Sequence, residues 1–100
     1  MKDMPTKPAR QPCFSLGGVV ATPGVLAAFA ATGERITRCL AQHQCGEWGQ
    51  LDPADVRANE EALRCGARVF SAYQLTDGTK IYIITEADRK HTCVLLPSEY

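Results

Sequence analysis

The chain lacks a long apolar run, an excess of charge of either sign, and any paired-cysteine motif. Its 100 residues contain no apolar stretch of about 18 residues, so we expect no membrane-spanning segment. Acidic and basic side chains number 11 each. This balance excludes a strongly acidic DNA mimic and a protein that holds nucleic acid by bulk charge, although it leaves room for a local basic patch.

The five cysteines are odd in number, and no two of them form a Cys-x-x-Cys pair. Because the N-terminus carries no export signal, we expect reduced thiols in the cytoplasm. Residues 1–13 contain prolines and basic side chains without an apolar segment, which predicts a flexible tail and not a signal peptide. Residues 14–100 are expected to form one domain with a modest core.

Motifs for phosphate binding and nucleophilic catalysis are also missing. Leu16-Gly17-Gly18 lacks the lysine and the spacing of a P-loop, and there is no nucleophile elbow. Cys39, His43, Cys45 and Glu47 form the most metal-like grouping, since residues four apart on a helix can share one ion. Zinc sites normally need a second such pair. We therefore predict buried, apolar cysteines, with no metal and no cofactor.

Three short helices are expected in the first two thirds of the chain. Thr22-Pro23 combines a good N-cap with proline at the first helical position, and Gly33 ends that helix. A second helix is expected from about 34 to 43, and a third from Asp52-Pro53 to Cys65-Gly66. Each has a stripe at helical spacing: Val25, Leu26, Phe29 and Ala30; Ile36, Cys39, Leu40 and His43; Val56, Asn59 and Leu63.

The strongest local signal is Asp77-Gly78 between two apolar runs, which predicts a β-hairpin. With these two residues at the centre of the turn, Tyr73 lies opposite Tyr82. A third strand at 92–96 completes an antiparallel meander. With a short strand within 14–21, in which two glycines indicate a bulge or a close backbone approach, the predicted fold is α+β.

In this register both faces of the hairpin are apolar, which is unusual for an antiparallel sheet with one wet side. Either helices cover both faces, or one face meets a partner. An uncovered tyrosine face could pair with its own copy about a two-fold axis, so we expect a homodimer or a hetero-complex. One face would carry Phe70, Ala72, Ile81, Ile83 and Thr85, and the other Val69, Tyr73, Leu75, Tyr82 and Ile84.

His43 and Trp48 each admit two interpretations. His43 is either a core histidine that bonds a carbonyl or Asn59 at the end of its helix, or a general base. Trp48, which stands between glycines, either anchors its loop on the domain or is exposed as a recognition aromatic.

A charged bend follows the second hairpin strand. Glu86, Asp88 and Arg89 could supply a carboxylate pair with a cation for acid–base or phosphate chemistry. The alternative is a solvated turn with one internal salt bridge.

Several ordered motifs resemble those of one known family, over about residues 16–100. It comprises small bacterial proteins carried by plasmids and integrated elements, with no established activity. Its members have Asp in place of Glu47 and Trp in place of Tyr82, and they lack most of these cysteines, which argues against a shared role for the thiols. The motifs are Val19-Val20-Ala21-Thr22-Pro23-Gly24, His43-x-x-Gly46-Glu47-Trp48-Gly49, Arg68-Val69-x-Ser71-Ala72-Tyr73, Ile83-Ile84-Thr85-Glu86-Ala87-Asp88-Arg89 and Leu95-Leu96-Pro97-Ser98-Glu99-Tyr100.

Three functions follow as hypotheses. The first is a non-enzymatic protein-binding module of a mobile element, as an accessory or anti-defence factor. Its candidate binding residues are His43, Trp48, Tyr73, Tyr82, Glu86, Asp88 and Arg89. The second is a small hydrolase or nuclease that uses His43 with the Glu86–Arg89 bend. The third is single-stranded nucleic-acid binding by stacking and charge. Its residues would be Lys80, Arg89, Lys90 and His91 beside Tyr73 and Tyr82.

Overall fold

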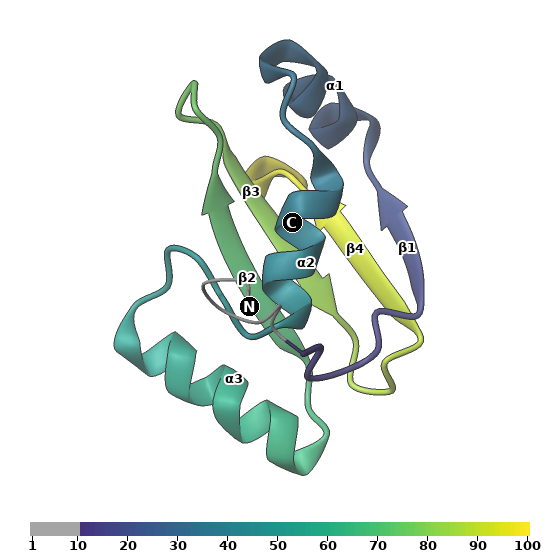
Figure 1. Ribbon diagram of the computed structural model, residues 1–100, viewed down its shortest axis with the longest axis vertical. Helices are drawn as coiled ribbons and strands as arrows, with labels where there is room; N and C mark the ends of the chain where they lie inside the picture. The colour runs from purple at the N-terminus through teal and green to yellow at the C-terminus, as the bar shows by residue number, and fades with distance from the viewer. Residues whose placement is uncertain (1–10) are drawn as a thin grey trace, which may run out of the picture.

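A four-stranded mixed sheet organises the chain, with strand order β1-β4-β3-β2 (Figure 1). The computed structural model describes residues 11–100. The α+β class, the N-terminal strand, the three helices and the antiparallel meander are confirmed. The elements are β1 (Gly18–Ala21), α1 (Pro23–Thr32), α2 (Ile36–Gln44), α3 (Pro53–Cys65), β2 (Val69–Gln74), β3 (Lys80–Thr85), β4 (His91–Leu95) and the one-turn 3-10 helix η1 (Pro97–Glu99).

Residues 1–10 of the expected tail lie outside the described residues. The backbone N–H of Cys13 donates to the carbonyl of Gln44 at 2.7 Å, so the chain already contacts the end of α2 at Cys13. Among residues 11–100, no helix has both the length and the apolar character to cross a bilayer.

The ends of α1 and α3 follow local chemistry. Thr22 accepts a hydrogen bond from the N–H of Val25, and Asp52 accepts one from the N–H of Asp55. Both helices end at a glycine with positive φ. Two members of the predicted α1 stripe are wrong: Leu26 is half exposed and Ala30 is exposed, because only Val25 and Phe29 face the sheet closely enough to be buried.

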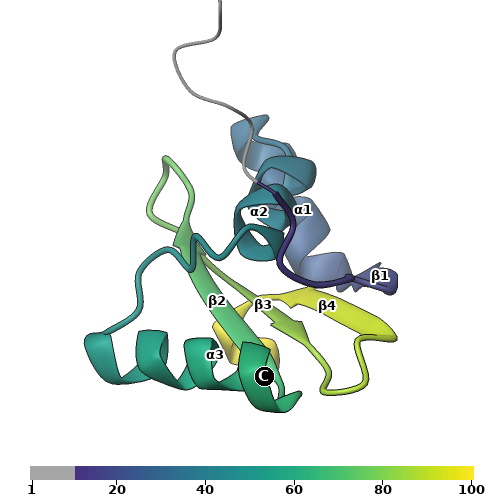
Figure 2. The ribbon, with the colours of Figure 1, turned by 60° about the horizontal axis from the view of Figure 1, so that its bottom comes forward.

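Helices α1 and α2 cover one face of the sheet, which we call the inner face (Figures 1 and 2). Helix α3 lies beside the free edge of β2, where it packs on a second, smaller cluster that contains Trp48 and Val69. The opposite, outer face carries η1 and the C-terminal residue. The main core lies between the inner face and the two helices: Val25, Phe29, Cys39, Leu40, Tyr73, Leu75, Ile81, Ile83 and Val94.

The hairpin turn is one residue longer than expected. The N–H of Gly78 donates to the carbonyl of Leu75 at 2.9 Å, and the N–H of Leu75 donates to the carbonyl of Thr79 at 2.8 Å. Together with φ of +92° at Gly78, these bonds define a three-residue loop with a glycine bulge. Glu34, at the start of α2, accepts from the N–H and the hydroxyl of Thr76 and holds this loop.

The longer turn makes the predicted strand register wrong by one residue. Tyr82 lies opposite Ala72, and Ile81 lies opposite Tyr73. A one-residue shift moves the side chains of one strand to the other face relative to its partner. Tyr73 therefore belongs to the inner face and Tyr82 to the outer face.

β1 pairs in parallel with β4, a contact between the two ends of the domain. The expected close backbone approach at the paired glycines is confirmed. A Cβ on Gly17 would lie 2.3 Å from the carbonyl carbon of Lys90, and Gly17 has φ of +65°. Only glycine fits here without moving the β3–β4 turn.

Side chains and a neighbouring loop close the outer edge of β2. The amide of Asn59 bonds both backbone groups of Phe70, with Nδ2 to O at 2.6 Å and N to Oδ1 at 3.0 Å. Ala72 donates to the carbonyl of Trp48 at 3.1 Å and accepts from the N–H of Gln50 at 2.6 Å. The asparagine that interrupts the apolar stripe of α3 thus acts as a substitute strand.

We predict that Asn59→Leu lowers the free energy of unfolding by about 2–5 kcal/mol, because it leaves the partly buried N–H and C=O of Phe70 without their partners. Urea denaturation measures the loss. Glu60→Ala, at the exposed neighbouring position, is the control and should change stability by no more than about 0.5 kcal/mol. A cost for Asn59→Leu as small as that of the control would refute the role.

Candidate functional site

His43 lies in a buried chain of polar side chains between α2 and the inner face. Nδ1 is 2.5 Å from Oγ of Ser71, and Nε2 is 2.9 Å from Oγ1 of Thr85. The Thr85 hydroxyl is 2.7 Å from that of Thr92, which donates to the carbonyl of Leu16 at 2.7 Å. The four side-chain residues in this chain are completely shielded from solvent.

The carbonyl at the end of this chain determines the direction of every proton. The hydroxyl of Thr92 donates its only proton to the carbonyl of Leu16, so it accepts a hydrogen bond from the hydroxyl of Thr85. Thr85 then accepts from Nε2–H of His43, and Nδ1 accepts from the hydroxyl of Ser71. His43 is therefore the neutral Nε2–H tautomer, with both ring nitrogens used inside the protein.

The surroundings of His43 keep it neutral. The rings of Phe14 and Trp48 contact it edge-on, with centroids at 5.2 and 5.8 Å. Burial, with a smaller contribution from the charge of Arg89, lowers the pKa of His43 from 6.5 to about 4. The core interpretation fits, although its partners are hydroxyls and not Asn59 or a carbonyl. A general base needs access to substrate, which this enclosed ring does not have.

Trp48 serves as an anchor. It is 6% exposed, stacks on Phe14 at 6.3 Å, and packs with Ala62 and Val69. Gly49 after it has φ of +78°, and a Cβ there would lie 2.0 Å from the carbonyl oxygen of Ala72. The indole is thus not available as an exposed recognition aromatic.

Arg89 clamps the β3–β4 turn to the end of α3. It is the non-glycine residue with positive φ (60°) in residues 11–100, and its guanidinium donates to the carbonyls of Ala62 at 3.2 Å and Ala67 at 2.6 Å. It also donates to the carbonyl of Glu86 at 3.1 Å. The expected salt bridge with a carboxylate is wrong, because backbone carbonyls take the guanidinium. Such carbonyls at a helix C-terminus favour a cation.

The two carboxylates of this bend stay at the surface. Glu86 and Asp88 are exposed, and Asp88 accepts from the N–H of Lys90 at 2.9 Å. His43 is enclosed behind Phe14. The groups that a hydrolase would need in one pocket are therefore separated by burial.

The predicted tyrosine patch does not form, because its members divide between the two faces. Val69, Tyr73 and Leu75 face the helices, whereas Tyr82 and Ile84 lie on the outer face. Tyr73 is 7% exposed and its hydroxyl donates to the carbonyl of Glu47 at 2.7 Å. The five side chains therefore do not form the single contiguous surface that was expected for self-pairing.

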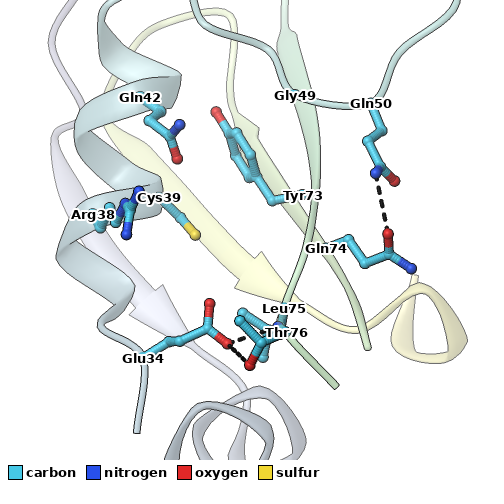
Figure 3. A pocket seen from close by; sticks show the side chains of 10 residues that line it. All are labelled: Glu34, Arg38, Cys39, Gln42, Gly49, Gln50, Tyr73, Gln74, Leu75 and Thr76. Atoms are coloured by element: carbon cyan, nitrogen blue, oxygen red, sulfur yellow. Dashed lines mark hydrogen bonds between the residues drawn. The ribbon is translucent and has the colours of Figure 1, made fainter. Parts of the chain in front are cut away.

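A pocket of about 300 Å³ opens between α2, the loop at 49–50 and the end of β2 (Figure 3). Cys39 and Tyr73 lie on its walls. Burial raises the pKa of both, so neither is a ready nucleophile. The carboxylate of Glu34, at one end, is held by Thr76, and the hydrogen bonds from Thr76 lower its pKa. The pocket offers hydrogen-bonding amides but no activated group.

Aromatic side chains gather on the outer face. The ring of Tyr82 contacts Phe70 edge-on at 4.8 Å and Tyr100 at 6.0 Å. Arg68 donates to the hydroxyl of Tyr100 at 3.0 Å. Tyr100 is 66% exposed, while Phe70 and Tyr82 are partly exposed. We call Phe70, Tyr82 and Tyr100 the outer aromatic cluster. Of these three, the sequence hypotheses included only Tyr82; period-two alternation from Tyr82 in the correct register would have found Phe70.

A second hollow of about 200 Å³ adjoins this cluster, where the outer face meets the start of α3. Its charged groups are of both signs, with Lys80 on β3 and Asp52 and Asp55 on the first turn of α3. The aromatic wall and mixed charge suit a side chain of a protein ligand.

The five cysteines, which all lie within residues 11–100, form no disulfide, and only Cys39 is buried, so the expectation of buried cysteines holds for one of them. Among residues 11–100, no three His, Cys, Asp or Glu side chains come together as a metal site.

No protein-family model, curated protein or solved structure matches the chain. The resemblance to mobile-element proteins therefore stays a prediction.

The buried His43 predicts a specific dependence of stability on pH. The unfolded chain binds a proton on this imidazole near pH 6.5, whereas the folded protein binds it only near pH 4. Stability is therefore lost as the pH falls through this window, by about 3 kcal/mol in total. Urea denaturation from pH 7 down to pH 4 measures the loss.

His43→Gln should flatten this pH dependence between pH 6.5 and 4.5, although it also lowers stability at pH 7. His91→Gln, at an exposed position, is the matched control and should leave the slope unchanged. NMR of the wild-type imidazole should show the Nε2–H tautomer. A charged His43 at pH 6 or the Nδ1–H tautomer would contradict the proton directions assigned to the buried hydrogen-bond chain.

Proposed function

We propose that this protein is a small, non-catalytic module that binds a protein partner on the outer face of its sheet. The observation that carries the proposal is the outer aromatic cluster, in which Tyr82 is held between Phe70 and Tyr100 on the face opposite α1 and α2. Aromatic rings on a sheet face that α1 and α2 leave uncovered are typical of interaction surfaces.

Pre-organisation supports binding at this cluster. Tyr82 is fixed on both sides by ring contacts, and Arg68 orients the hydroxyl of Tyr100. A partner would therefore bury aromatic surface with little further loss of side-chain freedom. The adjoining hollow provides room for one anchoring side chain.

The positions of the candidate catalytic groups favour binding over hydrolysis. His43, Trp48 and Arg89 are each engaged in holding the domain together. Glu86 and Asp88 remain as exposed carboxylates, and the enclosed His43 is not available to them as a base. The proposal therefore assigns no chemistry to these residues.

Charge favours a protein over nucleic acid as the ligand. Lys80 and Arg68 border the outer face, but Asp52 and Asp55 line the same hollow as Lys80. Carboxylates at that rim would repel a phosphate backbone, and the whole chain has no net charge.

The biological setting is inferred from the sequence motifs. We infer an accessory or anti-defence role for a mobile element, from the resemblance described above. The odd number of cysteines, without a Cys-x-x-Cys pair, supports a reducing cytoplasm as the compartment.

We predict that Tyr82→Ser with Tyr100→Ser weakens capture of the partner by about 10- to 100-fold, the effect of removing one or two aromatic anchors. Tagged protein incubated with lysate of the bacterial host should retain one protein at near-stoichiometric amounts. Circular dichroism checks that the variant is folded.

Leu26→Ser is the matched control, because Leu26 is an exposed apolar residue on α1, away from the outer face. It should leave capture unchanged. Capture that survives the tyrosine substitutions would refute the site. Retention of nucleic acid that falls steeply with salt would favour the nucleic-acid hypothesis instead.

A further inference from the structure

The two edge strands of the sheet differ in whether their outward-pointing backbone groups are hydrogen-bonded. At the β2 edge, Asn59 bonds Phe70, and the segment around Gly49 bonds Ala72, so the ladder groups are paired. At the β1 edge, no strand formed by residues 11–100 pairs on the outer side. In both ribbon views β1 forms a border of the molecule (Figures 1 and 2).

Two hydrogen bonds to β4 and the turn before it show which groups of β1 point outward. The N–H of Gly18 donates to Lys90 at 2.8 Å, and that of Thr22 donates to Val94 at 3.1 Å. In a parallel ladder, alternate residues bond the same neighbour. The backbone groups of Gly18, Val20 and Thr22 therefore face β4, and those of Val19 and Ala21 face outward.

Of the usual protections against further pairing, this edge has only the shortness of its strand. β1 reads Gly-Val-Val-Ala, without a charge, a proline or a bulge. Val19 is 43% exposed and Val20 is 56% exposed, so both faces of the strand present apolar surface at the edge. An extended segment that joined here would gain backbone hydrogen bonds and cover both valines.

We propose that β1 pairs antiparallel with β1 of a second copy of this chain, about a two-fold axis at Val20. The strand is complementary to itself in this register. Val19 of each copy exchanges a pair of hydrogen bonds with Ala21 of the other, which satisfies all the outward groups of β1. Val20 then meets Val20 of the second copy as a non-hydrogen-bonded pair on the outer face.

The product is a continuous eight-stranded sheet in which β1 is no longer an edge. The outer faces of both copies lie on the same side of this sheet, so a dimer would present two outer aromatic clusters. The inference rests on the β1 edge alone and does not require the proposed partner. Because the paired strand is short, the dimer is a weak one.

Disulfide trapping tests the register. Val20→Cys, with Cys13, Cys45, Cys65 and Cys93 replaced by Ser, should form a covalent dimer with a mild oxidant such as diamide, since directly opposed antiparallel residues have Cα atoms within bonding range. Val19→Cys in the same background is the matched control. It is exposed on the same strand but lies diagonal to its own copy, so it should trap several-fold more slowly.

Sedimentation of the native chain provides a test without new thiols. We expect a reversible dimer whose fraction increases with protein concentration up to about 1 mM, the weak end of specific association. Val20→Lys places like charges opposite each other and should give a monomer, whereas Val20→Thr should keep the dimer. A native monomer throughout this range, an intact dimer in Val20→Lys, or faster trapping at Val19 than at Val20 would overturn the proposal.

Discussion

The rest of the structure depends on the buried hydrogen-bond chain through His43. It joins α2 to β2, β3 and β4, and it reaches the segment before β1 through the carbonyl of Leu16. A buried polar network is stable only when every member is satisfied, and this one has a single consistent direction of protons. A slip of β2 or β3 by one residue would move Ser71 or Thr85 to the other face and leave the imidazole unsatisfied. The buried hydrogen-bond chain therefore selects the sheet register as well as the position of α2.

Side chains that bond the backbone hold the remaining elements in place. Asn59 acts as a strand beside β2, and Arg89 caps α3. Glu99, near the C-terminus, accepts from the hydroxyl of Thr22 at 2.6 Å and from the N–H of Leu96 at 2.8 Å. Mainly through the bond from Thr22, its pKa is lowered, so the carboxylate stays ionised beside the N-terminus of α1. In this small domain, the polar side chains of Asn59, Arg89 and Glu99 thus stabilise the fold.

Because these polar side chains hold the fold together, binding has to use the exposed surfaces of the domain. One sheet face is covered by helices, and one sheet edge is closed by Asn59 and the loop after Trp48. The partly exposed outer aromatic cluster and the β1 edge remain accessible. The outer face offers fixed aromatic rings, while the β1 edge offers backbone groups. These are different modes of recognition, so a partner and a second copy can bind without competing for the same residues.

Local chemistry was enough to predict the helix caps at Thr22 and Asp52, the glycine stops, and the existence of the hairpin, because each depends on a few adjacent residues. The length of the hairpin turn could not be read locally, since Glu34 holds Thr76 from a distant part of the chain. That single residue of turn length determined which face carries Tyr82, and hence the candidate site. The partners of His43 and the pairing of β1 with β4 join segments far apart in sequence. Only the tertiary structure decided them, because a side chain's role depends on which neighbours and how much water surround it after folding.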